Sequence, residues 1–132
     1  MTIASKILNT LNTRLSVLPG VPPIALPNDK YAPVIGTMFL SANILPADTT
    51  TATVESLENH KGIYQVDVFV PAETGTFAVN NMADSIADHF AVDRDLTGVR
   101  IRSITIDRGD RDGAWYIVPV SIVYDTYHKR SY

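Results

Sequence analysis

The chain has 132 residues, a length typical of one domain. Hydrophobic residues make up 45% of it and the net charge is -3, which argues against a disordered chain and against a basic surface for nucleic acid. It contains no cysteine, which excludes disulfides, thiolate nucleophiles and cysteine metal sites. The N-terminal fifteen residues lack a continuous apolar segment, so we expect neither a signal peptide nor a transmembrane span there.

An amphipathic helix is predicted at the N-terminus. Apolar residues recur at helical spacing between residues 3 and 18, and Thr2 is placed to cap the helix. Pro19-Gly20 would end it. Four prolines follow within residues 20–33, which predicts extended chain crossing the surface.

The first long strand is predicted within residues 34–45, which are rich in branched and aromatic side chains. Pro46 would end this strand, and the Thr-rich segment 48–53 is polar. We therefore predict a long mobile loop at about residues 43–58. The alternative for this loop is a functional segment that becomes ordered on contact with a partner.

A strand, a tight loop and a helix are predicted in one run over residues 62–90. Alternation of apolar residues from Tyr64 to Val70 is typical of a half-buried strand, which Pro71 would end. A second apolar stripe at helical spacing runs from Val79 to Phe90. This arrangement indicates a helix laid over an antiparallel sheet.

Two more strands are predicted in the C-terminal part. In residues 99–107 the apolar parity changes, which predicts a bulge near Arg102-Ser103. Asp112-Gly113 indicates a hairpin. The last strand, 114–124, is apolar on both parities, and Pro119 in its middle predicts an edge, a bulge or a covering partner chain.

The predicted fold class is α+β. We expect an about four-stranded antiparallel sheet with a helix packed on one face and an additional N-terminal helix. Residues 1–132 would form a single domain, and residues 127–132 would be a short, polar, exposed tail.

Two groups of side chains suggest catalytic or metal chemistry, and one tripeptide suggests cell adhesion. Asp84, Asp88 and His89 could suggest a metal site, but His89 lies about 100° around the helix from Asp88, so the three do not converge. A solvated polar face, or a face that meets a partner chain, is the alternative.

His60, Asp67 and either Ser121 or Ser103 could make a hydrolase triad, but no serine lies in a nucleophile elbow. Arg108-Gly109-Asp110 matches a cell-adhesion tripeptide, although glycine and aspartate are common in turns.

Two further groups suggest protein contacts. Arg100 and Arg102 form a basic pair on one strand, either for surface ion pairs or for an acidic neighbour across a subunit interface. Trp115 and the tyrosines near it would serve as core or as interface anchors.

The block YQVDVFVPAETGT, followed by ADSIADHF and by the C-terminal GAWYIVPVSIVYDTY, resembles the tail terminator-like proteins of long-tailed bacteriophages. The resemblance covers most of residues 1–127. It implies a small structural subunit that closes into a homohexameric ring at the head-proximal end of the tail tube, stops tube polymerisation and offers a docking surface to the head connector. Its implied partners are further copies, the tail tube protein and the head–tail connector protein.

The resemblance also implies a virion protein assembled in the host cytoplasm, without an enzymatic activity, a cofactor, a bound metal, a membrane or sequence-specific binding of nucleic acid. The alternatives are another neck or connector ring subunit, a small metal-dependent enzyme using Asp84, Asp88 and His60, and an adaptor that binds a host protein. From the residues themselves we predict subunit or partner contacts at Arg100, Arg102, Asp84, Asp88, Trp115, Pro119, Thr49, Thr50 and Thr51.

Overall fold

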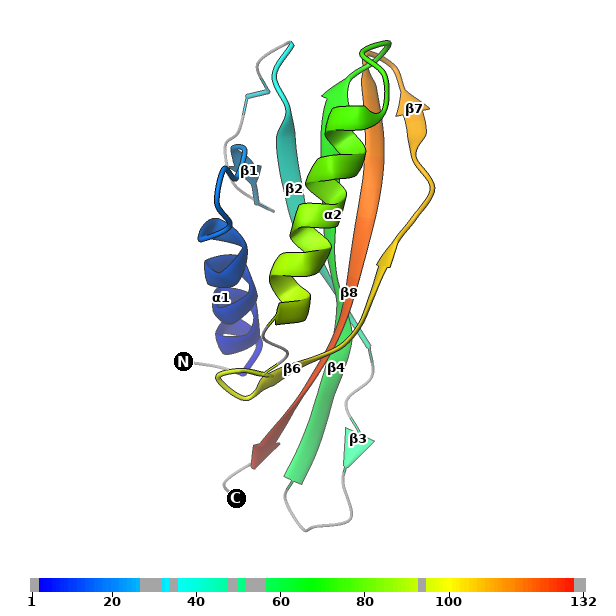
Figure 1. Cartoon of the computed structure of the whole chain (residues 1–132). Helices are drawn as coiled ribbons and strands as arrows, with labels where there is room; N and C mark the ends of the chain where they lie inside the picture. Colours follow the sequence, from blue (N-terminus) through cyan, green and yellow to red (C-terminus); the bar gives the residue numbers. More distant parts are fainter. Residues whose placement is uncertain are drawn as a thin grey trace.

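Two helices pack on the same side of a twisted, curled sheet (Figure 1). The structure, a computed structural model, describes residues 3–26, 32–33, 36–47, 50–51, 57–92 and 95–129. The elements are, in chain order, α1 (Ile3–Ser16), β1 (Ile24–Ala25), β2 (Phe39–Pro46), β3 (Thr50–Thr51), β4 (Leu57–Pro71), α2 (Phe77–Val92), β5 (Asp95–Leu96), β6 (Val99–Ile106), β7 (Asp110–Asp112) and β8 (Trp115–Lys129).

The sheet formed by the described residues has eight strands. Their order is β1-β2-β4-β8-β6-β5, with β3 beside β4 and β7 beside β8. The long strands β2, β4, β8 and β6 pair antiparallel, whereas β1 pairs parallel with β2. The sheet is therefore mixed. The α+β class is correct, but the prediction of a four-stranded antiparallel sheet was wrong.

The strands that the prediction lacked are short. β1, β3, β5 and β7 have only two or three residues each, which is too few for a period-2 pattern to be visible. β1 lies in the proline-rich segment predicted as extended chain, and β7 lies in the segment predicted as a turn. These residues form strands because each short segment pairs with a long neighbouring strand. Such pairing depends on residues outside the short segments, so the segments themselves do not reveal it.

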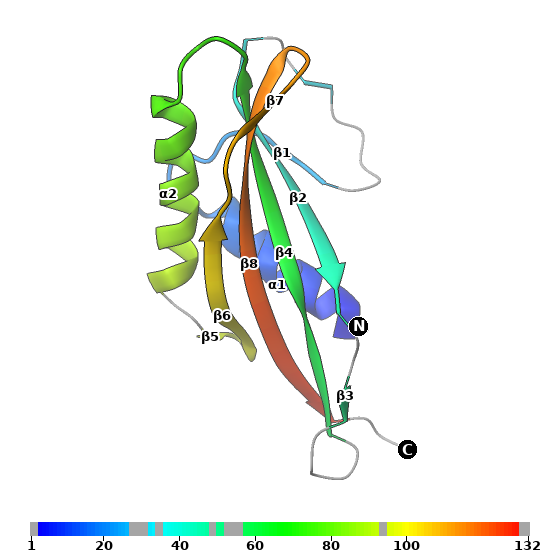
Figure 2. The same ribbon diagram turned by 90° about the vertical axis from the view of Figure 1, so that its right-hand side faces the viewer.

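The two faces of the sheet differ along every long strand. On β4, Tyr64, Val66 and Val68 are fully buried, while the residues between them are half-buried. We call the face that carries these buried residues the helix-covered face, because α1 and α2 pack on it. The opposite face is the helix-free face, on which none of the described helices lies (Figure 2).

The predicted apolar stripes of both helices form the core on the helix-covered face. Ile7, Leu11 and Leu15 of α1 are buried there. The buried residues of α2 are Val79, Ala83, Ile86 and Phe90. α1 is further fixed to the sheet by the Tyr64 hydroxyl, which donates to Oδ1 of Asn12 at 2.6 Å. Burial raises the pKa of this tyrosine well above its ordinary value.

The bulge predicted in the strand after α2 is confirmed. The register between β6 and β8 shifts between Ile101 and Ser103, which places both Arg102 and Ser103 on the helix-free face. Ile104 consequently packs against the core, as the prediction required. Ile106, by contrast, is 39% exposed at the end of the strand.

Pro119 lies in an interior strand with continuous register to β4, so the expected edge or bulge is not present. Its carbonyl accepts from the backbone N–H of Asp107 at 2.9 Å, which shows that its backbone points toward β6 and β7. β6 ends at Ile106 and β7 begins at Asp110. The nitrogen of Pro119 therefore faces the segment 107–109 between the two strands, so the missing N–H interrupts neither β6 nor β7.

Strands occupy part of the segment predicted as a loop and part of the segment predicted as a tail. β2 extends to Pro46, β3 pairs with β4 at Asn59 and Glu58, and β4 begins at Leu57. Residues 48–49 and 52–56 lie outside the described residues, so mobility of this segment stays a prediction. β8 continues to Lys129, well beyond the predicted end. Figure 2 shows the ends of β4 and β8, with β3 beside them, projecting past α2.

Candidate functional site

The two described helices leave the helix-free face of the sheet uncovered (Figure 2). Apart from the buried Phe39, the apolar side chains on this face are half-buried or exposed, and they alternate along the strands with the helix-covered core residues. They include Ile63, Phe69, Ile117, Pro119 and Val123. Leu45, on the outer strand β2, is 47% exposed. Rows of half-exposed apolar side chains among polar ones are suited to contact with another protein chain.

An aromatic cluster lies at one end of this face. Phe39 stacks on Phe69 with ring centroids 4.5 Å apart, and Trp115 meets Phe39 edge-on at 5.1 Å. Phe39 is buried within this cluster, whereas Phe69 and Trp115 are half-buried. Trp115 therefore packs within its own chain and still exposes one side to solvent. It is not a fully buried core residue, and its role as an interface anchor stays a prediction.

A charged cluster lies at the other end. The carboxylate of Asp125 is buried, and Nη2 of Arg102 lies 2.8 Å from its Oδ2. Nε of Arg100 lies 3.4 Å from Oδ1. The hydrogen bond and the charge of Asp125 raise the pKa of Arg102. The guanidinium of Arg100 also lies 5.4 Å from the ring centre of Tyr127.

The two arginines are therefore paired with a carboxylate of their own chain. Asp125 was missed by the sequence reasoning, because the last strand was predicted to end at Tyr124. The sequence did contain a signal for it, because Asp125 continues the alternating positions of Ser121 and Val123. Extending the predicted strand by one residue would have placed Asp125 on the helix-free face.

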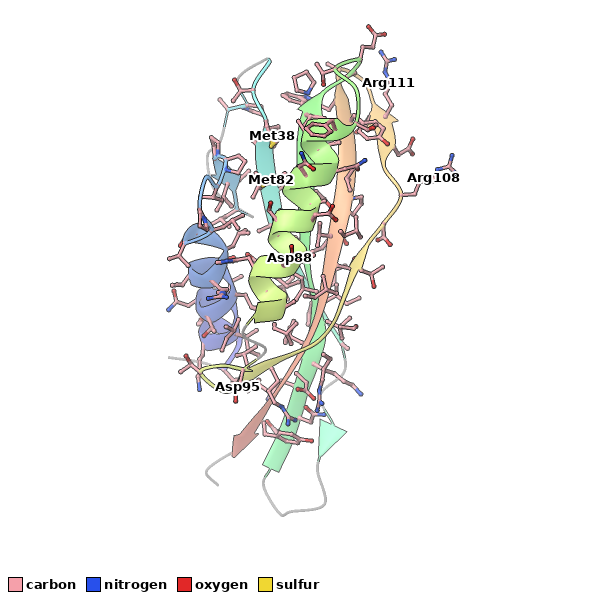
Figure 3. The ribbon with its side chains drawn as sticks, in the orientation of Figure 1. Met38, Met82, Asp88, Asp95, Arg108 and Arg111 are labelled. Atoms are coloured by element: carbon pink, nitrogen blue, oxygen red, sulfur yellow. The ribbon has the colours of Figure 1, made fainter. Side chains whose placement is uncertain are left out.

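The acidic residues of α2 point away from the sheet. Asp84 and Asp88 are exposed, and Figure 3 shows Asp88 on the outer side of the helix. His89 lies between α1 and α2 instead. Its Nε2 is 2.7 Å from the carbonyl oxygen of Arg14, and Nη2 of Arg14 donates to the His89 carbonyl at 2.6 Å. Within the described ranges no group of three or more His, Asp or Glu side chains is arranged to hold a metal ion.

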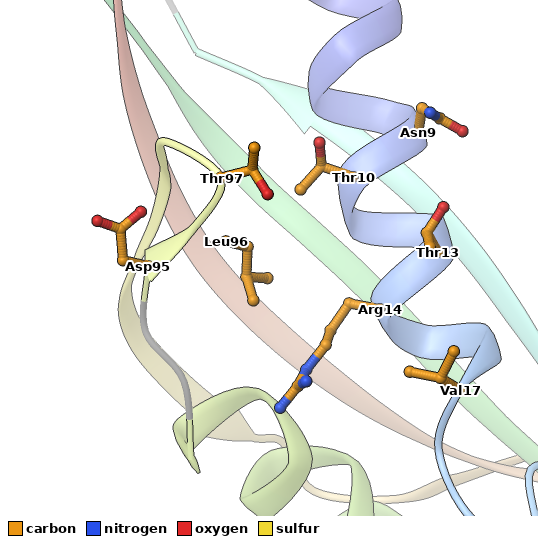
Figure 4. Close-up of a pocket in the computed structure, with 8 residues that line it drawn as sticks. All are labelled: Asn9, Thr10, Thr13, Arg14, Val17, Asp95, Leu96 and Thr97. Atoms are coloured by element: carbon orange, nitrogen blue, oxygen red, sulfur yellow. The ribbon is translucent and has the colours of Figure 1, made fainter.

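A polar pocket of about 400 Å³ lies between α1 and the β5–β6 turn (Figure 4). Thr10, Thr13 and Thr97 contribute hydroxyl groups, and Asp95 lies at its rim. The guanidinium of Arg14 extends along the pocket toward α2, where it bonds to the His89 carbonyl. The arginine therefore joins the two helices, which is a structural role.

The residues of the hypothetical hydrolase triad are not brought together. His60 and Asp67 lie on opposite faces of β4, because they are an odd number of positions apart on one strand. His60 contacts Glu58 at 3.2 Å, and Asp67 accepts from Gln65 at 2.9 Å. The hydroxyl of Ser121 donates to Oδ2 of Asp107 at 3.4 Å. Ser103 lies at the bulge of β6.

The Arg108-Gly109-Asp110 tripeptide has a packing explanation. A Cβ at Gly109 would collide with the ring of Tyr116, so the chain needs glycine at this close approach. Asp110 begins β7 and pairs with Ile117. The tripeptide thus joins β6 to β7 through a segment packed on an aromatic ring.

The predicted contact residues lie on three separate parts of the molecule. Arg100, Arg102, Trp115 and Pro119 share the helix-free face, while Asp84 and Asp88 lie on the outer side of α2. The backbone of Thr50 and Thr51 forms β3 at the projecting end of the sheet. Thr49 lies outside the described residues.

Comparisons with known proteins give one family and one fold. A family described as phage tail terminator protein matches residues 6–124. A solved structure of a protein whose name states no function superimposes with a TM-score of 0.71 at 24% identity, covering 100% of this chain and 99% of that one. That likeness shows the fold alone. The comparison with curated proteins gives no match. None of the described helices is long and apolar enough to cross a membrane.

Proposed function

The chain belongs to the phage tail terminator protein family, and on that basis we propose that it forms a homohexameric ring that caps the head-proximal end of the tail tube. Membership makes the protein a structural component of the phage tail, and hence of the virion, rather than an enzyme. The observation that carries the proposal is the family match, which spans residues 6–124 and so includes both helices and most of the sheet.

The mechanism follows from the geometry of rings. A heterologous contact, repeated by rotation, closes a ring only when the angle between subunits fits, and otherwise a filament grows. A closed ring of these subunits would bind the last layer of the tail tube protein on one side. On the other side it would refuse a further tube layer and offer a docking surface to the head–tail connector protein.

Two surfaces of the subunit support this arrangement. The helix-free face, with Trp115 and Pro119 on it, carries half-buried apolar side chains suited to a lateral contact. The ends of β4 and β8, with Thr50 and Thr51 of β3 beside them, project beyond the helices (Figure 1). We assign this projecting end to an axial contact with the tube or the connector.

Mass in solution tests the ring. Light scattering over a concentration series should find a species with six times the 14.5 kDa mass of one chain. A monomer at every concentration would contradict a ring that forms by itself. Purified protein should then be added to uncapped tails, and failure to cap them in electron micrographs would contradict the terminator function.

Removing Thr49–Thr53 tests the projecting end. We expect the variant to fold, since the part of this segment that the structure describes, Thr50 and Thr51 of β3, adds just two residue pairs to the sheet. It should leave tails of uncontrolled length or tails without heads. Normal, length-controlled tails would exclude an axial role for this end. Labelled protein found at the portal rather than at the tail end would favour a connector subunit instead.

A further inference from the structure

The outer side of α2 carries negative charge that no described residue neutralises. Asp84 and Asp88 lie four residues apart and therefore on the same side of the helix. Both are exposed, and neither forms an ion pair with another described residue. We call these two residues the acidic face of α2.

The helix-free face carries an excess of positive charge near the projecting end. Lys61 on β4 and Arg100 on β6 are both register partners of Asp125 on β8, so the three side chains form a row across the sheet. Arg102 joins the row from the bulge and pairs with Asp125. Asp95 of β5 is the register partner of Arg100 on its other side, so this part of the sheet holds three cations and two carboxylates. We call Lys61, Arg100 and Arg102 the basic row.

Much of the basic row remains accessible despite the carboxylate. The side chains of Arg100 and Arg102 are 41% and 50% exposed, and Lys61 is exposed. Tyr127 beside Arg100 is 47% exposed. Arginine and tyrosine are the residue types enriched at the energetic centres of protein interfaces.

The acidic face and the basic row lie on opposite sides of the subunit. α2 covers one face of the sheet, and the basic row lies on the other (Figure 2). One chain therefore does not bring them together, whereas two chains do. We propose that the acidic face of α2 of one copy docks on the basic row of the next copy, and that this is the lateral contact of the ring.

The charges also select the kind of symmetry. A two-fold contact that pairs the acidic face with the basic row would need both patches in one interface, which their places on opposite sides of the subunit do not allow. The remaining two-fold contacts place like charges against one another and are disfavoured. A contact of acidic face with basic row is heterologous and repeats in one rotational direction, as a ring requires. The inference rests on the proposed function, because it names the contact that holds that ring together.

Charge exchange tests this contact. Asp84→Lys with Asp88→Lys should weaken association at least tenfold, measured by light scattering or sedimentation at low salt. Lys61→Glu with Arg100→Glu should weaken it similarly. The four substitutions combined should restore association, because the two patches are then complementary again. Wild-type association should also weaken as salt is raised.

Two controls keep the result interpretable. Circular dichroism and thermal melts report whether each variant folds, and Lys61→Glu alone tests the basic row while leaving the Arg100–Asp125 pair intact. Lys6→Glu, at an exposed position of α1 outside both patches, should leave association unchanged.

The outcomes separate the two proposals. If the wild type assembles and folded charge variants assemble equally well, the contact is wrong while the ring stands. If exchange weakens association but the combined variant does not recover, direct pairing of the two patches is wrong. A wild type that stays monomeric at every concentration contradicts ring formation in solution, and the lateral contact falls with it.

Discussion

The two faces of the sheet are built from the same strands, yet they are packed very differently. On β4, Tyr64 and Val66 of the helix-covered face are fully buried, whereas Ile63 and Gln65 of the helix-free face stay half-buried. Since side chains of a strand alternate between faces, one strand can hold the fold together and present a contact surface at once. Substitutions on the two faces should therefore separate stability from assembly.

The largest expected difference between the faces concerns two phenylalanines. Phe90 is fully buried between α2 and the sheet, so Phe90→Ala should lower the free energy of unfolding by about 3–5 kcal/mol. Phe69 stacks on Phe39 on the helix-free face and is only half-buried. Phe69→Ala should lower it by about 1–2 kcal/mol. Urea unfolding monitored by circular dichroism measures both.

Equal losses in the free energy of unfolding from Phe90→Ala and Phe69→Ala would contradict the proposed difference in packing between the two faces. They would mean that the helix-free face is as tightly packed in the isolated chain as the core. A small loss for Phe69→Ala accompanied by weaker association would instead show that this face is completed by another chain.

The alternation that separates the faces could be predicted from the sequence. Tyr64 to Val70 shows a clean period of two, and the change of parity after Ile101 correctly indicated the bulge of β6. The stripes of α1 and α2 were equally visible, because each recurs over three or more turns. These features depend on neighbouring residues in the chain, which is why sequence reasoning can find them.

The features that could not be predicted depend on pairing between distant segments. β1 is a strand because Ile24 and Ala25 meet Leu40 and Ser41, and nothing within the two residues themselves indicates it. Asp125 lies beyond the predicted end of its strand, and it meets Arg100 only because β8 pairs with β6 there. The nitrogen of Pro119 faces the segment between β6 and β7, which lies there only because both strands pair with β8.

Stability at high pH should depend on the helix-covered face. Burial raises the pKa of both Tyr64 and Tyr124, so the folded protein keeps these protons when the unfolded chain loses them above about pH 10. Below that pH the two tyrosines are protonated in both the folded and the unfolded state, so they do not make the free energy of unfolding depend on pH. Above that pH, Tyr64 should lower the free energy of unfolding by up to about 1.4 kcal/mol per pH unit, and Tyr124 should change it in the same direction.

Tyr64→Phe isolates the part of this pH dependence that comes from Tyr64. The variant should lose some stability at neutral pH, because Asn12 loses its hydrogen-bond donor. Between about pH 10 and pH 11, however, its stability should fall by about 1 kcal/mol less than that of the wild type. Parallel profiles for the two proteins in urea unfolding would contradict burial of this hydroxyl.

The smallest expected effect is at Pro119, and it tests whether the place of its nitrogen, between β6 and β7, explains this residue. Pro119→Ser restores an N–H that would point between β6 and β7, so we expect stability to change by no more than about 0.5 kcal/mol. The matched control is Ser121→Pro, two positions along, where the N–H points toward Thr105 of β6. Losing that ladder hydrogen bond should cost about 1–3 kcal/mol. If Pro119→Ser left the monomer unchanged but weakened association, the ring itself would require proline here, and a neighbouring subunit would then cover this position.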